Sequence, residues 1–184
     1  DLLNYGTETQ KYVEKTETPA DPINGELTEE QMSWATSAVP SCSSVTNKNY
    51  EVVDNALATW KTAGLELEDA VIVRLGFETE DVEGMTVRVR LESGKTWTVA
   101  NDEISYDSTS GRYIFKLHNL NAHQMRETIY VTVYKDGVAV SNTLRYSIES
   151  YASTKQQADD PLLVNLVNAM MRYGDATEAY NDAN

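Results

Sequence analysis

The residues of this chain that could act as a nucleophile or bind a transition metal are few. The single cysteine, Cys42, stands among serines with no neighbouring histidine or basic residue to stabilise a thiolate. The two histidines, His118 and His123, fall in an expected loop between strands, whereas zinc sites usually take three or four nitrogen, sulfur or oxygen ligands. We therefore expect Cys42 to be a small buried apolar residue, the histidines to be loop residues, and the chain to need no metal or cofactor.

Carboxylates are numerous, but their pattern indicates no catalysis. General acid–base chemistry by two carboxylates needs a cleft that separates their pKa values, and the acidic residues here fall in short turns between strands. No serine elbow, phosphate-binding glycine loop or dinucleotide motif occurs. We therefore expect a protein without enzyme activity.

The charge of the chain limits its partners. Asp and Glu number 29 against 15 Lys and Arg, which gives a net charge of −14 at pH 7. Such a balance disfavours nucleic acid, because phosphate binding needs a basic surface. The acidic residues 78–83 form either a solvated turn, which we favour, or a calcium site, although their spacing matches no named calcium loop. Apolar stretches are too short to insert into a membrane.

Aromatic residues give the one signal for a ligand. Tyr130 and Tyr134 alternate with apolar residues, so both side chains point to one face of the expected strand at 127–135. That face is either open and polar or covered by the C-terminal helix, and we favour coverage because the apolar stripe of the helix needs a partner.

Trp97 depends on the turn that precedes it. A two-residue loop at Ser93-Gly94 would place Trp97 opposite Arg90, on the outer face with Arg88. A three-residue loop would place it opposite Leu91 in the core. The candidate ligand-binding residues are therefore Trp97, Arg88, Arg90, Tyr130 and Tyr134, which could stack on a sugar and donate hydrogen bonds to it.

The elements that would position these residues follow from the spacing of apolar residues. From about residue 45 to 151 the apolar period is two, and turn signals recur every 8–12 residues, which predicts about eight short strands. We expect a mainly β fold, an antiparallel immunoglobulin-like β-sandwich, although the Cys–Trp–Cys core of true immunoglobulins is absent. Trp60 is expected in the core.

Both ends of the chain have helical spacing. Asp159 or Asp160 is the expected N-cap of the C-terminal helix, and Pro161 suits its first turn. Residues 1–13 are expected to be the end of a helix, and a linker with two prolines follows at 14–26. A capping box at residues 28–31 predicts a short helical turn that carries Met32 and Trp34.

One short phrase occurs at both ends of the chain. Leu2-Leu3-Asn4-Tyr5-Gly6 is matched by Met170-Met171-Arg172-Tyr173-Gly174, and Tyr12 follows the first copy as Tyr180 follows the second. Such self-similarity is typical of one unit of an array. We expect residues 1–13 to close a preceding repeat, 14–26 to be a linker, 27–152 to be the β-sandwich domain, and 153–184 to be a helix that packs on the sandwich or the next repeat. The expected inter-repeat contacts are Tyr5, Gly6, Tyr12, Tyr173, Gly174 and Tyr180.

This order of elements resembles repeated modules of large secreted proteins of anaerobic Gram-positive bacteria. The resemblance covers most of the chain and rests on the two Tyr-Gly pairs, Tyr12, Tyr146-Ser147 and Ser150-Tyr151, in a run expected to be a strand. The chain departs from it at the acidic residues 78–83 and at Thr7-Glu8-Thr9, where small residues are expected. The family implies a non-catalytic extracellular module and supplies no catalytic residues.

Two functions follow as expectations. The first is a structural or interaction module of a multi-domain bacterial surface protein, adhesin-like or a spacer, whose partners are neighbouring repeats and possibly glycans or a host or cell-surface protein. The alternative is a carbohydrate-binding module that uses exposed aromatic residues. Either would be extracellular, secreted or attached to the cell surface.

Overall fold

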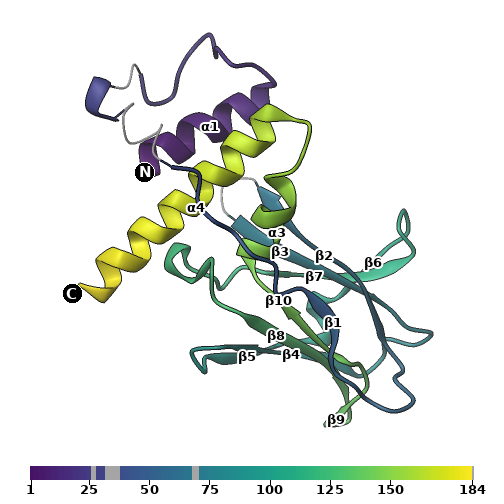
Figure 1. The fold of residues 1–184 in the computed structure, drawn as a ribbon. Coiled ribbons are helices and arrows are strands. Elements are labelled where there is room, and N and C mark those ends of the chain that lie inside the picture. The colour runs from purple at the N-terminus through teal and green to yellow at the C-terminus, as the bar shows by residue number, and fades with distance from the viewer. Residues whose placement is uncertain (26–27, 32–37, 68–70, 184) are drawn as a thin grey trace. The chain divides into compact units, whose positions relative to one another are not determined.

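The computed structural model, drawn in Figure 1, describes residues 1–25, 28–31, 38–67 and 71–183. The chain divides into two compact units. The helical unit comprises Asp1–Ser44, Asn121–Arg126 and Glu149–Asn184, and the β unit comprises Val45–Leu120 and Glu127–Ile148. Residues 38–44, which were expected inside the sandwich domain, thus belong to the helical unit. The expected division into repeat, linker and domain stays a prediction.

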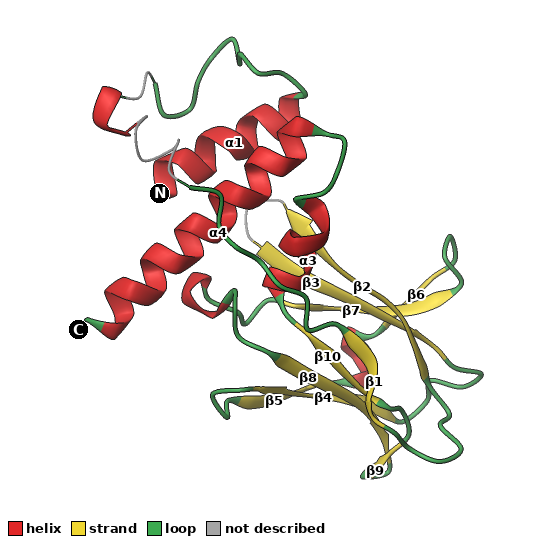
Figure 2. Cartoon of the chain, in the orientation of Figure 1, coloured by secondary structure: helices red, strands yellow, loops and turns green. Residues whose placement is uncertain are grey.

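The β unit consists of two antiparallel sheets, as expected for a β-sandwich (Figure 2). The first sheet has the order β1-β10-β8-β4-β5, with β9 paired to β8, and the second has the order β2-β3-β7-β6. The strands are β1 (Asn47–Glu51), β2 (Thr59–Leu67), β3 (Val71–Glu78), β4 (Met85–Leu91), β5 (Thr96–Val99), β6 (Ser105–Asp107), β7 (Arg112–Leu117), β8 (Ile129–Lys135), β9 (Val138–Ala139) and β10 (Thr143–Tyr146). The described residues therefore form ten strands where the sequence predicts about eight.

The core of the β unit follows from the alternation of each strand. In β4 every second residue from Met85 to Leu91 is buried, and the residues between them are at least partly exposed. Trp60 of β2 is buried, with its ring edge-on to Phe77 at 5.7 Å and to Phe115 at 6.0 Å between centroids. Its Nε1 donates a hydrogen bond to the Asn142 carbonyl at 2.7 Å, so the one polar atom of the indole is satisfied. The predicted core position of Trp60 is confirmed.

The helical unit contains α1 (Leu2–Glu14), the short helix η2 (Ala122–Gln124), most of α3 (Ile148–Lys155) and α4 (Pro161–Asp182). Asp160 is the N-cap of α4, since its carboxylate accepts from the amides of Leu162 at 3.0 Å and Leu163 at 3.4 Å. Pro161 occupies the first helical position, as predicted. Of the helices in the described part of the chain, none combines the length and apolarity required to cross a bilayer.

Helix α3 corrects one prediction, that the strand ending in Tyr146 continues to about residue 151. Tyr146, Ser147 and Ile148 are all buried, so the alternation of buried and exposed residues that marks a strand ends there. Ile148 and Ala152, one helical turn apart, are both buried. The apolar spacing therefore changes from strand to helix at Ser147.

The expected linker folds back along α1. The Gln10 side chain donates to the Asp21 carbonyl and accepts from the Ile23 amide, both at 2.9 Å. The Asn24 side chain donates to the Leu3 carbonyl at 2.8 Å. The prolines suggest a weakly ordered connection. In the structure, the side chains of Gln10 and Asn24 instead bind this segment to α1.

The capping box at residues 28–31 is confirmed by its two hydrogen bonds. The Gln31 side chain accepts from the Thr28 amide at 2.8 Å, and the Thr28 hydroxyl accepts from the Gln31 amide at 3.2 Å. Met32 and Trp34, which were predicted to follow in the same helical turn, lie outside the described residues.

Two glycines of the second sheet provide a matched test of its packing. A Cβ atom on Gly76 of β3 would overlap the side chains of Ile114 and Thr62, whereas a Cβ on Gly64 of β2 would meet no atom within 4 Å. We expect Gly76→Ala to lower the free energy of unfolding by about 1–3 kcal/mol through overpacking. Gly64→Ala should leave it unchanged or raise it by up to about 1 kcal/mol. Urea unfolding followed by tryptophan fluorescence measures both, and equal effects would contradict the packing described.

The turn between β6 and β7 provides a test by pH. The pKa of Asp107 is lowered, first because the Ser110 hydroxyl donates to its carboxylate at 2.8 Å, and then because the Thr109 amide also donates. A lowered pKa in the folded state means that the stabilisation is present above the ordinary carboxyl pKa and is lost as the pH falls through the lowered value. We expect Ser110→Ala to raise the pKa of Asp107, measured by NMR titration of its carboxyl carbon. An unchanged midpoint would show that the hydroxyl is not the main cause.

Candidate functional site

The outer face of the first sheet brings four of the predicted ligand-binding side chains together. Arg90 of β4 pairs with Tyr130 of β8, Arg88 pairs with Thr132, and Thr86 pairs with Tyr134. Directly paired residues of antiparallel strands share a face, so these arginines and tyrosines project from the side opposite the buried valines of β4.

A hollow of about 430 Å³ lies on this face. All five sequence candidates border it, together with Glu51 and a group of threonines. The full lining is Glu51, Arg88, Arg90, Thr96, Trp97, Thr98, Tyr130, Thr132, Tyr134 and Thr143. Every one of these residues belongs to the β unit.

Each tyrosine of the hollow is paired with an arginine. The Arg90 guanidinium lies over the Tyr130 ring at 4.1 Å from its centroid, and the Arg88 guanidinium lies over the Tyr134 ring at 4.3 Å. Tyr50 of β1 packs against Tyr130 with centroids 5.3 Å apart. The contacts of both tyrosine rings thus come from within the β unit, whereas the sequence favoured cover by the C-terminal helix.

The three-residue loop gives the observed face of Trp97, although not its partner. Residues 92–94 form a three-residue loop, and Trp97 pairs with Val89 instead of Leu91. It therefore shares the face of Val89, which is fully buried, and not that of Arg88 and Arg90. The indole is half-buried at the edge strand β5, with the Lys95 ammonium 5.5 Å from its ring centroid. Trp97 borders the hollow from β5, but its register directs the ring away from the tyrosines.

The polar groups of the hollow form a partial network. The Thr143 hydroxyl lies 2.8 Å from Glu51 and 2.8 Å from the Thr132 hydroxyl. Among the described residues, Arg88 and Arg90 form no ion pair, and the Tyr134 hydroxyl, 3.4 Å from Arg88, is their one side-chain acceptor. Burial raises the pKa of Tyr130, so its hydroxyl stays protonated and can donate a hydrogen bond near neutral pH.

The two copies of the repeated phrase meet in the helical unit. The rings of Tyr5 in α1 and Tyr173 in α4 are stacked, with centroids 5.8 Å apart and an interplanar angle of 11°. Burial is the main reason why the pKa of Tyr5 is raised. This contact lies inside one chain, and packing between repeats by these tyrosines stays a prediction.

The two glycines of the phrase have different neighbours. A Cβ on Gly174 would lie 2.9 Å from the Met125 sulfur and 3.2 Å from the Ala122 carbonyl oxygen, so α4 and η2 approach closely there. A Cβ on Gly6 would lie 3.0 Å from the Asn24 side chain, which is the end of a movable group. Tyr12 is half-buried with the Lys15 ammonium 3.5 Å from its ring centroid, whereas Tyr180 is 74% exposed.

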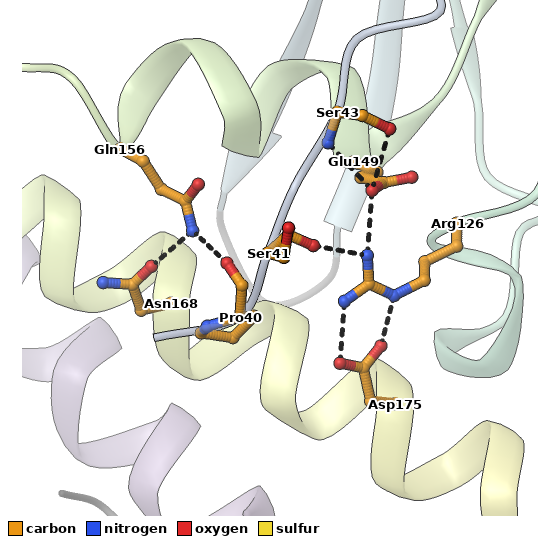
Figure 3. Close-up of polar contacts among 8 residues, drawn as sticks. All are labelled: Pro40, Ser41, Ser43, Arg126, Glu149, Gln156, Asn168 and Asp175. Carbon is orange, nitrogen blue, oxygen red and sulfur yellow. Dashed lines mark hydrogen bonds and ion pairs between the residues drawn. The ribbon is translucent and has the colours of Figure 1, made fainter. Parts of the chain in front are cut away.

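Arg126 is the residue that sequence reasoning missed. Its guanidinium binds both carboxylate oxygens of Asp175 in α4, at 2.6 and 2.8 Å (Figure 3). It also donates to Glu149 in the first turn of α3 at 2.9 Å and to the Ser41 carbonyl at 3.0 Å. The hydrogen bonds that Arg126 donates to Asp175 raise the pKa of Arg126 above its ordinary value. No motif signals this cluster, because its members are far apart in the sequence.

Cys42 and the two histidines are the other reactive residues that the sequence singles out. Cys42 is half-buried, and burial raises the pKa of its thiol, which disfavours the reactive thiolate. His118 is exposed between β7 and η2, and His123 is half-buried within η2. Within the described ranges, no group of three or more His, Cys, Asp or Glu residues could hold a metal ion.

Comparisons with known proteins add no relative. No family model matches the chain, and neither the curated proteins nor the solved structures contain a match to it.

The Arg126 cluster can be tested with two substitutions in the same helix. Asp175→Asn removes a charge that accepts two hydrogen bonds, and we expect it to cost about 1–2 kcal/mol. This is less than for a buried pair, because the Asp175 side chain is 40% exposed. Glu178→Gln removes the same charge one turn later, at an exposed residue with no ion pair among the described residues. It should be neutral in urea unfolding, and an equal loss in both variants would assign the effect to overall charge.

Proposed function

We propose that the chain is a non-catalytic module of a larger extracellular bacterial protein and that it occurs in tandem copies joined by their helices. The observation that carries this proposal is the stacking of Tyr5 on Tyr173, one tyrosine from each copy of the repeated phrase. In this scheme α1 is the closing helix of the preceding copy, and residues 14–26, 27–152 and 153–184 are the linker, sandwich and closing helix of the next. The sandwich would be of the immunoglobulin-like type.

Exposure along α4 supports a second helix contact. In α1, Asn4 of the repeated phrase is buried, and the side chain of Glu8, one turn later, is 12% exposed. Glu8 corresponds to Ala176 of α4, which is exposed, and Tyr12 corresponds to the exposed Tyr180. The last turns of α4 therefore carry the residues that would meet the next copy, and Ala176 leaves room for a close approach.

A tandem protein tests this coupling. Residue 13 corresponds to residue 181, so residues 14–184 are joined directly after residue 181 of a first copy, and α4 of that copy takes the place of α1. We expect the second copy to unfold at a higher urea concentration than the isolated segment 14–184, because neighbouring repeats stabilise each other. The two unfolding transitions can be followed by hydrogen exchange.

Ala176→Lys in the first copy is the matched control, because its counterpart in α1, Glu8, lies near Arg172, where a lysine would repel the second copy. The side chain is exposed, so this substitution should leave the single chain as stable as before. In the tandem protein it should remove most of the gain. A second copy that unfolds just as the isolated segment does would refute the coupling.

Saccharide binding is the second candidate function, and the hollow on the first sheet favours it. Its volume is within the range of about 300–1,000 Å³ typical of small-molecule sites. Hydroxyl groups of threonine and tyrosine border it, and such groups can both donate to and accept from sugar hydroxyls. The partner would be an extracellular glycan.

A further inference from the structure

We propose that the hollow on the first sheet binds saccharides that carry carboxylate groups, such as uronic acids, with Arg88 and Arg90 as the groups that recognise the carboxylate. This inference deepens the second candidate function, saccharide binding, and is independent of the helix coupling.

The first argument is the state of the two arginines. In the β unit, Arg74 and Arg112 are each within 4 Å of a carboxylate, as expected in a strongly acidic protein. Arg88 and Arg90 are exposed and have no carboxylate partner among the described residues. Glu51 is the one acidic residue in the lining, and Thr143 already donates to it. The hollow is thus a local basic site on a chain with a net charge of −14.

The second argument is the covering of the aromatic rings. A flat sugar would stack on a bare ring face, but the guanidiniums of Arg90 and Arg88 already lie over Tyr130 and Tyr134 at 4.1 and 4.3 Å. Tyr50 packs against Tyr130 as well. Neutral sugar stacking on these faces is therefore blocked, whereas the edges of the guanidiniums, which carry the N–H donors, remain available for a planar carboxylate. Stacking also restricts the arginine side chains and lowers the entropy lost on binding.

The third argument is the placement of hydroxyl groups beside the arginines. Thr96 pairs with Arg90 and Thr98 pairs with Arg88, so each arginine has an exposed threonine next to it on the same face. A carboxylate on a sugar ring lies next to ring hydroxyls. A guanidinium beside a threonine hydroxyl can therefore bind the carboxylate and a neighbouring ring hydroxyl together. Successive outward residues of a strand are roughly 7 Å apart, so Arg88 and Arg90 can contact two different groups of one oligosaccharide.

The net charge of the chain favours ligands of low charge density. Each uronic acid carries one charge, whereas a sulfated sugar can carry several and would be repelled more strongly by the acidic surface as a whole. At physiological salt, charges farther away than about 8 Å are largely screened, so a single carboxylate in the hollow responds chiefly to the two arginines.

The test is calorimetric titration of the full chain with a linear trimer of galacturonic acid. We expect binding that weakens with added salt and is lost for the methyl-esterified trimer, which has the same shape without the charges. Arg90→Gln and Arg88→Gln should each weaken binding about tenfold. Glu51→Gln should strengthen it roughly threefold, because its charge repels the ligand while an amide oxygen can still accept from Thr143. Lys15→Gln lowers the net charge by one, as each arginine variant does, but lies outside the β unit and should have no effect.

Each other outcome overturns the proposal. Equal binding of the esterified trimer would mean neutral sugar recognition, and unchanged affinity in both arginine variants would place the site elsewhere. Preference for a sulfated hexasaccharide, or for a pentaglutamate peptide, would assign the arginines to a different anion. No binding of the trimer would exclude the uronic-acid ligand, while the tandem protein would still test the helix coupling separately.

Discussion

The helical unit depends on one guanidinium. Arg126 follows η2 in the chain and holds Asp175 of α4, Glu149 of α3 and the backbone at Ser41. Charged groups that are partly withdrawn from water need partners, and one planar fork supplies the donors for both carboxylates and a carbonyl. Gln156 acts in the same way beside it, since its amide donates to the Pro40 carbonyl and to Asn168, each at 2.8 Å. Four separate segments of the chain are thereby fixed to one another.

Local patterns predicted most of the elements. The alternation in β4 and the N-cap at Asp160 are short-range features, and the structure contains both. The end of β10 was predicted too late, because the buried Ser147 is polar and therefore looks like an outward residue of a continuing strand. The strand count differs because β6 and β9 are too short to show a period.

The binding face could be predicted in part. The alternation of β4 and β8 was enough to place Arg88, Arg90, Tyr130 and Tyr134 together. Trp97 could not be placed, because a difference of one residue in a loop moves a side chain to the other face of the sheet. The pairing of each arginine with a tyrosine, and the Arg126 cluster, depend on contacts between distant segments, which no spacing in a single sequence reveals.

The stacked tyrosines have a consequence for molecules in which α1 detaches and binds α4 of another molecule. A chain whose α1 leaves α4 exposes Tyr173, and the phrase that fits there is present near both ends of every other copy. Contact between such molecules would be heterologous, with different surfaces on its two sides, and a heterologous contact that does not close a ring grows without limit. Mutual exchange of α1 between two molecules would close a symmetric dimer, whereas one-way donation would extend a linear array, and the intramolecular stacking of Tyr5 on Tyr173 competes with both.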